Sequence, residues 1–123
     1  TKDFLKKHPA IQIMLKDLIS YTKDPFFTLA IFGSYAKGTQ TSKSDLDLLL
    51  IIPTKKESGK FQAAIDKSYI KTKKDLIIVS TKECREMLQK SNQLNVGNET
   101  KKHHLLIHGA EQWYTLLREQ EHE

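Results

Sequence analysis

The chain has 123 residues, a net charge of +5 and a hydrophobic content of 38%. This length predicts a single domain over residues 1–123 with one core, and it leaves no room for a separate substrate domain. The low Gly and Pro content excludes collagen-like and low-complexity classes, and the charge is too mild to predict a nucleic-acid partner. A single cysteine, Cys84, excludes a disulfide framework and favours a cytoplasmic location. No apolar run approaches the roughly 20 residues of a membrane span, and no secretory signal is recognisable.

Apolar spacing predicts the elements of the first half of the chain. Pro9 opens a helix that ends at Asp24 and Pro25. Its apolar stripe consists of Ile11, Met14, Leu15, Leu18 and Ile19. Residues 27–32 read as a buried strand that Gly33 stops, residues 34–37 as the start of a short helix, and residues 38–44 as a polar loop. Residues 45–52 form a second apolar strand, which Pro53 closes.

The second half continues the alternation of helices and strands. We expect a helix over residues 55–70, a buried strand over 75–80, an edge strand over 103–108 and a final helix after Gly109. Thr81 is the expected cap of a further helix. Residues 92–102 are ambiguous. The first of these three helices is expected to face inward with Phe61, Ile65 and Tyr69, and the helix after Thr81 with Cys84, Met87 and Leu88. The final helix is expected to face inward with Ala110, Trp113, Tyr114 and Leu117. The pattern predicts an α/β (α+β) fold in which helices flank a small mixed β-sheet.

Three carboxylates lie near the starts of apolar strands. Asp45 and Asp47 are two residues apart on the second strand, so their side chains share one face and repel each other. A hard divalent cation such as Mg²⁺ relieves that repulsion, because it binds carboxylates together with substrate phosphates. Asp75 opens the third strand and is the best third ligand, and three such acids can hold two metal ions. Asp17, Asp24 and Asp66 are weaker candidates, since they lie on helices or in turns.

A glycine and a serine follow the first strand directly. Gly33 lets the backbone approach a ligand closely, and Ser34 offers a hydroxyl and a backbone N–H to a phosphate. Lys37 adds a cation, and Gly38 lets the loop fold back. A P-loop is excluded, because Thr39 and Gln40 stand where it needs Lys and Ser or Thr.

Other chemical groups carry less information. His103, His104 and His108 match no standard zinc spacing, although His104 and His108 would share one face of a strand. Trp113 and Tyr114 are interpreted chiefly as core residues, with a protein interface as the alternative. Cys84 is interpreted as a small buried apolar residue.

Gly33-Ser34, ten residues and then Asp45-Leu46-Asp47 resemble the signature of the DNA polymerase β-like nucleotidyltransferases. The string GSYAKGTQTSKSDLDLLLI is similar to the minimal nucleotidyltransferases (MNT) of bacteria and archaea, and the resemblance covers essentially the whole chain. It implies the nucleotidyltransferase fold and catalysis by Asp45, Asp47 and Asp75 with two Mg²⁺ or Mn²⁺ ions. It also implies nucleotide binding by Gly33, Ser34, Lys37 and Ser44. Lys37 stands where relatives often have Arg, so charge is kept and a bidentate grip on phosphate is lost.

The resemblance implies transfer of a nucleoside monophosphate, AMP from ATP, to an acceptor hydroxyl with release of pyrophosphate. MNT proteins are often paired with a small helical HEPN-type toxin, and some adenylylate a Tyr of that partner. Two alternatives stay open: an antitoxin-like binding module that acts by contact, and a small-molecule nucleotidyltransferase. The nucleotide base, the acceptor and the oligomeric state are also open.

Overall fold

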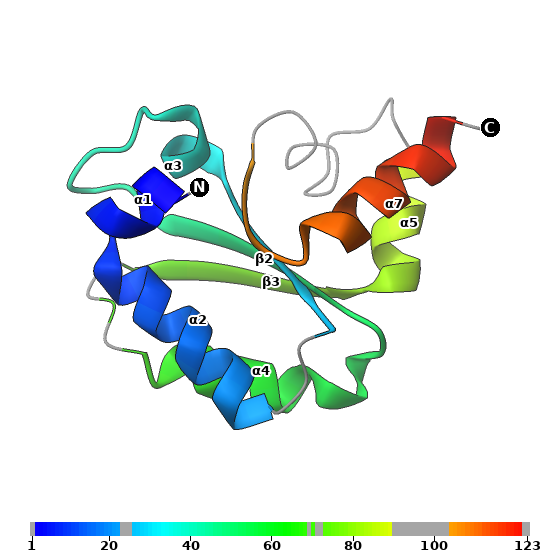
Figure 1. The fold of residues 1–123 in the computed structure, drawn as a ribbon, viewed down its shortest axis with the longest axis horizontal. Helices are drawn as coiled ribbons and strands as arrows, with labels where there is room; N and C mark the ends of the chain where they lie inside the picture. The colour runs from blue at the N-terminus through cyan, green and yellow to red at the C-terminus, as the bar shows by residue number, and fades with distance from the viewer. Residues whose placement is uncertain (1, 23–25, 69, 71–72, 90–103, 122–123) are drawn as a thin grey trace.

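A computed structural model describes residues 2–22, 26–68, 70, 73–89 and 104–121. Its centre is a four-stranded sheet in the order β3-β2-β1-β4 (Figure 1). The strands are β1 (Thr28–Phe32), β2 (Leu46–Ile52), β3 (Lys74–Ser80) and β4 (Leu105–His108). β1 pairs antiparallel with β2 and β4, whereas β2 pairs parallel with β3. The predicted mixed sheet and its edge strand near residue 105 are therefore confirmed.

Helices cover both faces of this sheet (Figure 1). α2 (Pro9–Thr22) and α4 (Ser58–Asp66) pack on one face, and α5 (Thr81–Gln89) and α7 (Ala110–Glu121) pack on the other. Three shorter elements complete the described chain: α1 (Lys2–Lys7), α3 (Gly33–Lys37) and the 3-10 turn η1 (Lys55–Glu57). None of the helices within the described ranges is long and apolar enough to cross a membrane.

β2 is buried on both faces, which explains its almost uninterrupted apolar sequence. Leu46, Leu48 and Leu50 contribute to the core under α2 and α4, while Leu49 and Ile51 belong to the core under α5 and α7. The predicted stripe of α2 is confirmed, with Ile11, Met14 and Leu18 buried and Leu15 and Ile19 half-buried.

Several expected boundaries shift. β1 begins one residue after the expected start, β2 starts at Leu46 rather than Asp45, and β3 starts at Lys74, one residue before Asp75. The expected helix over residues 55–70 divides into η1 and α4, which ends at Asp66. Helix α1 was not anticipated, because its sequence is short and mostly charged. Tyr69, residues 92–102 and His103 lie outside the described residues.

The start of α5 shows a cap that differs from the expected one. The Ser80 hydroxyl accepts the N–H of Glu83 at 3.1 Å, and the Glu83 carboxylate accepts the N–H of Ser80 at 3.0 Å. This reciprocal pair is a capping box, and it lowers the pKa of Glu83 through the backbone hydrogen bond from Ser80. Thr81, the expected cap, instead donates to the carbonyl of Ile52.

The inward faces of the last two helices are only partly as expected. Cys84 and Leu88 are buried, and burial raises the pKa of the Cys84 thiol to about 11, as expected for an inert core residue. Trp113 is fully buried, but Tyr114 is 51% exposed, so its assignment to the core was wrong. Leu116 takes the second core position in α7, and Ala110 is exposed.

His108, which ends β4, and His104, which directly precedes β4, do not share one environment. The ring of His104 lies against that of Trp113, with 5.6 Å between the ring centroids, and the ring of His108 lies against that of Phe27, with 4.4 Å between the centroids. Trp113 and Phe27 belong to the two opposite cores. A register shift in the pairing of β1 with β4 changes the alternation of side chains, so the expectation of one shared face was wrong.

Gly109 makes the turn from β4 into α7 and has φ of +78°. A Cβ there would overlap the Phe27 carbonyl oxygen and the Thr28 side chain. We therefore expect Gly109→Ala to lower the free energy of unfolding by about 2–3 kcal/mol, measured by urea denaturation. Gly59→Ala is the matched control, because Gly59 is helical and has open space around its Cβ position. Equal stability of the two variants would contradict this account.

Candidate functional site

The three candidate acids meet at one end of the sheet. In the register of the strands, Asp47 lies between Phe32 of β1 and Asp75 of β3. Asp45 precedes β2 by one residue, two positions before Asp47, and therefore lies on the same face. Asp75 is thus level with Asp47, two residues further into the sheet than its expected place opposite Asp45. Parallel pairing of β2 with β3 brings together acids that are 28 residues apart in the sequence.

The three carboxylates of the cluster affect one another's charge. Burial raises the pKa of Asp47, and the carboxylates of Asp75 and Asp45 raise it further. Asp75 is exposed, whereas Asp45 and Asp47 are half-buried. Within the described residues, no three His, Cys, Asp or Glu side chains converge closely enough to hold a metal ion as they stand. The donor set is nonetheless made of hard carboxylate oxygens, the ligands that Mg²⁺ prefers.

The absence of a side chain at Gly33 leaves the space that the Asp47 carboxylate occupies. The φ of Gly33 is +69°, and a Cβ at this position would overlap Oδ2 of Asp47. The carboxylate therefore lies directly against the glycine backbone. Any larger residue at position 33 would move it, so the Gly required by the motif has a local steric reason in this fold.

The short helix α3 follows directly and presents the other residues of the predicted phosphate site. Ser34 is half-buried, and its carbonyl accepts the N–H groups of Gly38 and Thr39. Gly38 ends the helix in the left-handed conformation, with φ of +74°. Lys37 is exposed in the last turn of α3. Ser34 and Lys37 therefore follow Gly33 along α3, directly after the end of β1.

Ser44 makes hydrogen bonds within the loop that precedes Asp45. Its hydroxyl accepts the N–H of Thr41 at 2.8 Å, and its own N–H donates to the carbonyl of Thr41 at 3.1 Å. Lys43 donates its N–H to the Thr41 hydroxyl. These bonds close a turn immediately before Asp45, so Ser44 shapes the loop that leads into the acid cluster.

Two contributions to this end of the molecule were missed in the sequence. Helix α1 lies beside α3 (Figure 1). The ring of His8, just after α1, meets the ring of Tyr35 edge-on with 6.0 Å between ring centroids, and the ring of Phe4 lies tilted against His8 at 4.4 Å. Lys73 is exposed, and its carbonyl accepts the N–H of Leu46 at 2.8 Å. That bond keeps the chains of β2 and β3 side by side up to Asp45. The basic run from Lys71 to Lys74 was the available signal for Lys73, whereas α1 left no apolar pattern to find.

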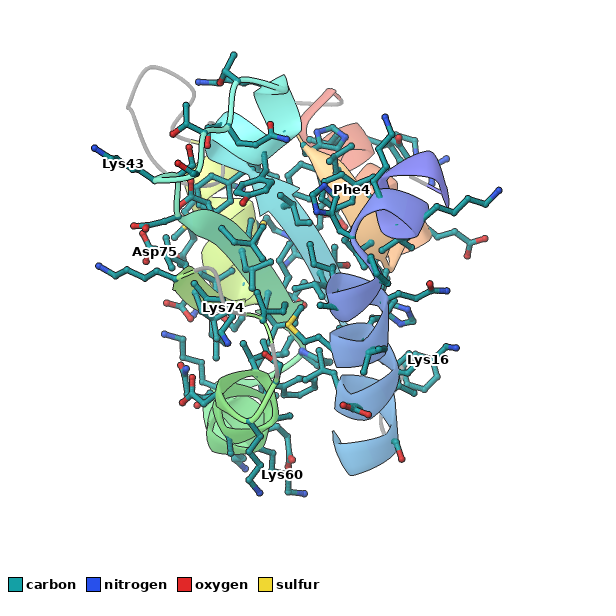
Figure 2. The ribbon with its side chains drawn as sticks, turned by 90° about the vertical axis from the view of Figure 1, so that its left-hand side faces the viewer. Phe4, Lys16, Lys43, Lys60, Lys74 and Asp75 are labelled. Atoms are coloured by element: carbon teal, nitrogen blue, oxygen red, sulfur yellow. The ribbon has the colours of Figure 1, made fainter. Side chains whose placement is uncertain are left out.

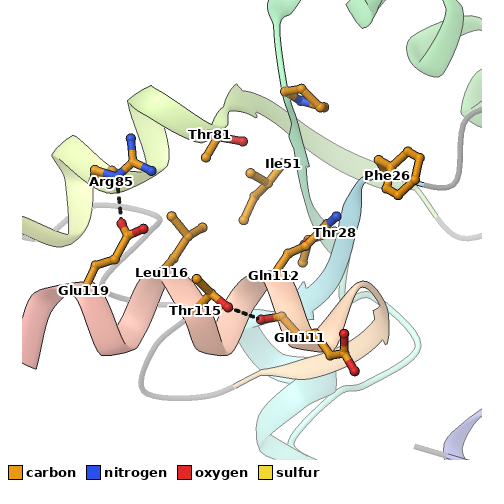
Figure 3. A pocket seen from close by; sticks show the side chains of 11 residues that line it. Phe26, Thr28, Ile51, Thr81, Arg85, Glu111, Gln112, Thr115, Leu116 and Glu119 are labelled. Atoms are coloured by element: carbon orange, nitrogen blue, oxygen red, sulfur yellow. Dashed lines mark hydrogen bonds and ion pairs between the residues drawn. The ribbon is translucent and has the colours of Figure 1, made fainter.

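A separate cavity of about 350 Å³ lies between α5 and α7 at the opposite end of the sheet (Figure 3). Ile51 and Leu116 line it, and the ion pair between Arg85 and Glu119, at 2.8 Å, stands at its side. Thr28 in its wall is four residues along β1 from Phe32, which is about 13 Å. The cavity is therefore distinct from the acid cluster.

Comparisons with known proteins bear on the acid-bearing end of the sheet. The sequence model of the family described as "Nucleotidyltransferase domain" matches residues 15–105, which include all of the candidate site residues. A 49-residue segment is 47% identical to "Putative protein adenylyltransferase MJ0128" of Methanocaldococcus jannaschii. That segment is 40% of this chain and spans 42% of the relative, so less than half of the relative is matched.

A solved structure shares the fold. It is described as "Crystal structure of the toxin-antitoxin with AMP-PNP", and it superposes with a TM-score of 0.50 and 15% sequence identity. The superposition covers 90% of this chain and 87% of that chain. The order of strands and helices is thus that of a known fold, over nearly the whole length of both chains.

Proposed function

Because the chain belongs to the nucleotidyltransferase domain family, we propose that it transfers a nucleoside monophosphate from a nucleoside triphosphate to an acceptor hydroxyl, with release of pyrophosphate. The observation that carries this proposal is the cluster of Asp45, Asp47 and Asp75 beside Gly33. ATP is the proposed nucleotide, since the matched relative is named an adenylyltransferase and the similar solved structure is described with AMP-PNP.

Each residue of the site has a proposed role. The three carboxylates would hold Mg²⁺ or Mn²⁺, which would neutralise charge on the phosphates and on the attacking and leaving oxygens. Ser34 and the backbone of α3 would orient the triphosphate, and Lys37 would offset its negative charge. Ser44 would act indirectly, by fixing the turn that presents Asp45.

The proposed acceptor is a Tyr hydroxyl of a small helical partner protein of the HEPN type. Two observations support a protein acceptor: the name of the archaeal relative, and the description of the similar structure as a toxin-antitoxin complex. That same description supports a second candidate function, in which the chain neutralises a partner by contact alone. Asp47→Asn discriminates the two, because a contact antitoxin keeps its protective effect in the variant.

The transfer is tested with Mg²⁺ and each NTP labelled at the α-phosphate, with and without the protein encoded beside this chain. We expect label from ATP on the partner, together with pyrophosphate. Asp75→Asn should reduce the rate about a hundredfold or more, because it removes one carboxylate of the cluster and several kcal/mol of charge stabilisation. Asp66→Asn is the control, since Asp66 is exposed on α4, where it accepts a hydrogen bond from the Gln62 side-chain amide at 2.9 Å. Absence of label from every NTP would contradict the proposal.

A further inference from the structure

One edge of the sheet has no partner strand among the described residues. β3 is the outermost strand, and β2 occupies only its inner side. Its pairing with β2 is continuous from Lys74 to Ser80, with no bulge and no proline. Along its outer side, half of the backbone N–H and C=O groups therefore point away from β2. Such an edge is a template for a further strand.

A hollow beside this edge is suited to receive side chains. It has a volume of about 340 Å³ and lies between the start of α4 and β3. Its lining is Lys55, Ser58, Gly59, Gln62, Leu76 and Ile78. Gly59 has nothing within 4 Å of a Cβ position. An added strand would place alternate side chains opposite Leu76 and Ile78, so two apolar residues with one residue between them fit here.

The same edge leads to the acid cluster. Asp75 lies on β3 itself, is exposed, and is level with Asp47. Side chains alternate along a strand, so Asp75 lies on the opposite face from Leu76 and Ile78. A residue that pairs opposite Asp75 would therefore present its side chain to the three carboxylates, while its neighbours point their side chains into the hollow.

Lysines at the two ends of the edge favour acidic residues in an occupant on either side of the position opposite Asp75, where an acidic residue would be repelled. Lys73 precedes β3, and Lys56 and Lys82 lie near its far end; all three are exposed. Figure 2 shows Lys43, Asp75 and Lys74 along one side of the molecule, with Lys16 on the other. A second copy of this chain carries a net charge of +5 and would be repelled here, whereas an acidic segment would be attracted.

We propose that an extended, acidic polypeptide segment adds to the free edge of β3 and presents a hydroxyl-bearing side chain opposite Asp75. If the segment runs antiparallel to β3, its sequence from the N-terminus is an apolar residue, any residue, an apolar residue and then the hydroxyl-bearing residue. If it runs parallel to β3, the order is reversed. The segment supplies backbone hydrogen bonds for affinity and alternate side chains for specificity. The hydroxyl's role as acceptor rests on the proposed function, but the docking itself does not.

Two synthetic peptides test the docking without nucleotide: acetyl-EEITIYEE-amide and acetyl-EEYITIEE-amide. We expect at least one to slow amide hydrogen exchange in residues 74–80 of the full chain. The same peptides with proline in place of threonine should give no protection, because proline removes a donor and breaks the added strand. Protection that maps to α7 or β4 instead of β3, or equal protection by the proline peptides, would overturn the proposal.

Two variants test the hollow and the charge separately. Gly59→Leu fills the hollow and favours the helix in which it lies, so the chain should fold while peptide affinity falls about tenfold. Lys73→Glu should weaken binding about fivefold at low salt, and Lys16→Glu, with the same charge change on α2, should not. Unchanged affinity in both Gly59→Leu and Lys73→Glu would refute the proposed site.

The outcomes separate this inference from the proposed function. Peptide protection at β3 without any nucleotide transfer would uphold the docking and count against the transferase. Labelling of a partner protein without any protection of β3 would uphold the transferase and refute the docking. Formation of a dimer through β3, seen as concentration-dependent mass with protection of residues 74–80, would replace the acidic segment by a second copy and refute the proposal.

Discussion

Asp47→Asn should lower the rate of nucleotide transfer by about a thousandfold or more and, at neutral pH, make the chain more resistant to unfolding. The activity is lost because the central carboxylate of the cluster is removed. Stability rises because Asn has nearly the same shape, so it keeps the fit against Gly33 without a half-buried charge beside Asp45 and Asp75. A residue whose removal weakens function and strengthens the fold is held in place for function.

The sign of the pH dependence follows from the raised pKa of Asp47. The folded chain binds this proton more tightly than the unfolded chain does. The contribution of Asp47 to the free energy of unfolding is therefore highest below the unfolded pKa of 3.8 and falls as pH rises through the folded pKa. At neutral pH the charged form is a net cost. Asp47→Asn lacks this fall, so the stability curves of the variant and the unchanged chain should diverge as pH rises above 3.8.

Urea denaturation at several pH values measures this divergence, with Asp66→Asn as the control for removal of an exposed carboxylate. Mg²⁺ provides a second measurement. It should raise the unfolding midpoint of the unchanged chain by binding the folded cluster, and the rise should be much smaller in Asp47→Asn. A variant that is less stable than the parent at pH 7 would show that the acid cluster does not oppose folding.

The sequence predicted the positions of the candidate acids in the fold better than it predicted their surroundings. Gly33, Asp45 and Asp47 are close in sequence, and the alternation of a strand was enough to put the two acids on one face. Asp75 required one further assumption, that the second and third strands pair with their starts level, and the observed register differs from that by two residues. The roles of all these residues in nucleotide transfer stay predictions until they are tested.

The errors arose where long-range packing decides the outcome. The face of Tyr114 depends on how α7 sits against α5, and a helical stripe fixes the direction of a face only to within a residue or so. His104 and His108 contact opposite cores because of a register shift between β1 and β4, which no residue pattern in the sequence indicates. The cap of α5 is different, since Ser80 and Glu83 have the spacing of a capping box, and the signal was present in the sequence.

Gly33→Ala should disable the site through a single methyl group. The left-handed backbone at φ of +69° costs a non-glycine residue about 1–3 kcal/mol of stability. The new Cβ would also overlap Oδ2 of Asp47, and the short aspartate side chain has to rotate away from the cluster. We therefore expect a loss of transfer activity close to that of Asp47→Asn, although Ala at position 33 removes no charged or polar group.

Gly38→Ala is the matched control for the backbone, because Gly38 has φ of +74° and nothing within 4 Å of its Cβ position. Both variants should lose similar stability in urea denaturation, yet only Gly33→Ala should lose most of its activity. The overlap itself is isolated in an Asp47→Ala background, where Gly33→Ala should cost no more stability than Gly38→Ala does. If Gly33→Ala and Gly38→Ala lost activity equally, the contact between Gly33 and Asp47 would have no part in catalysis, and the glycine would serve only the turn into α3.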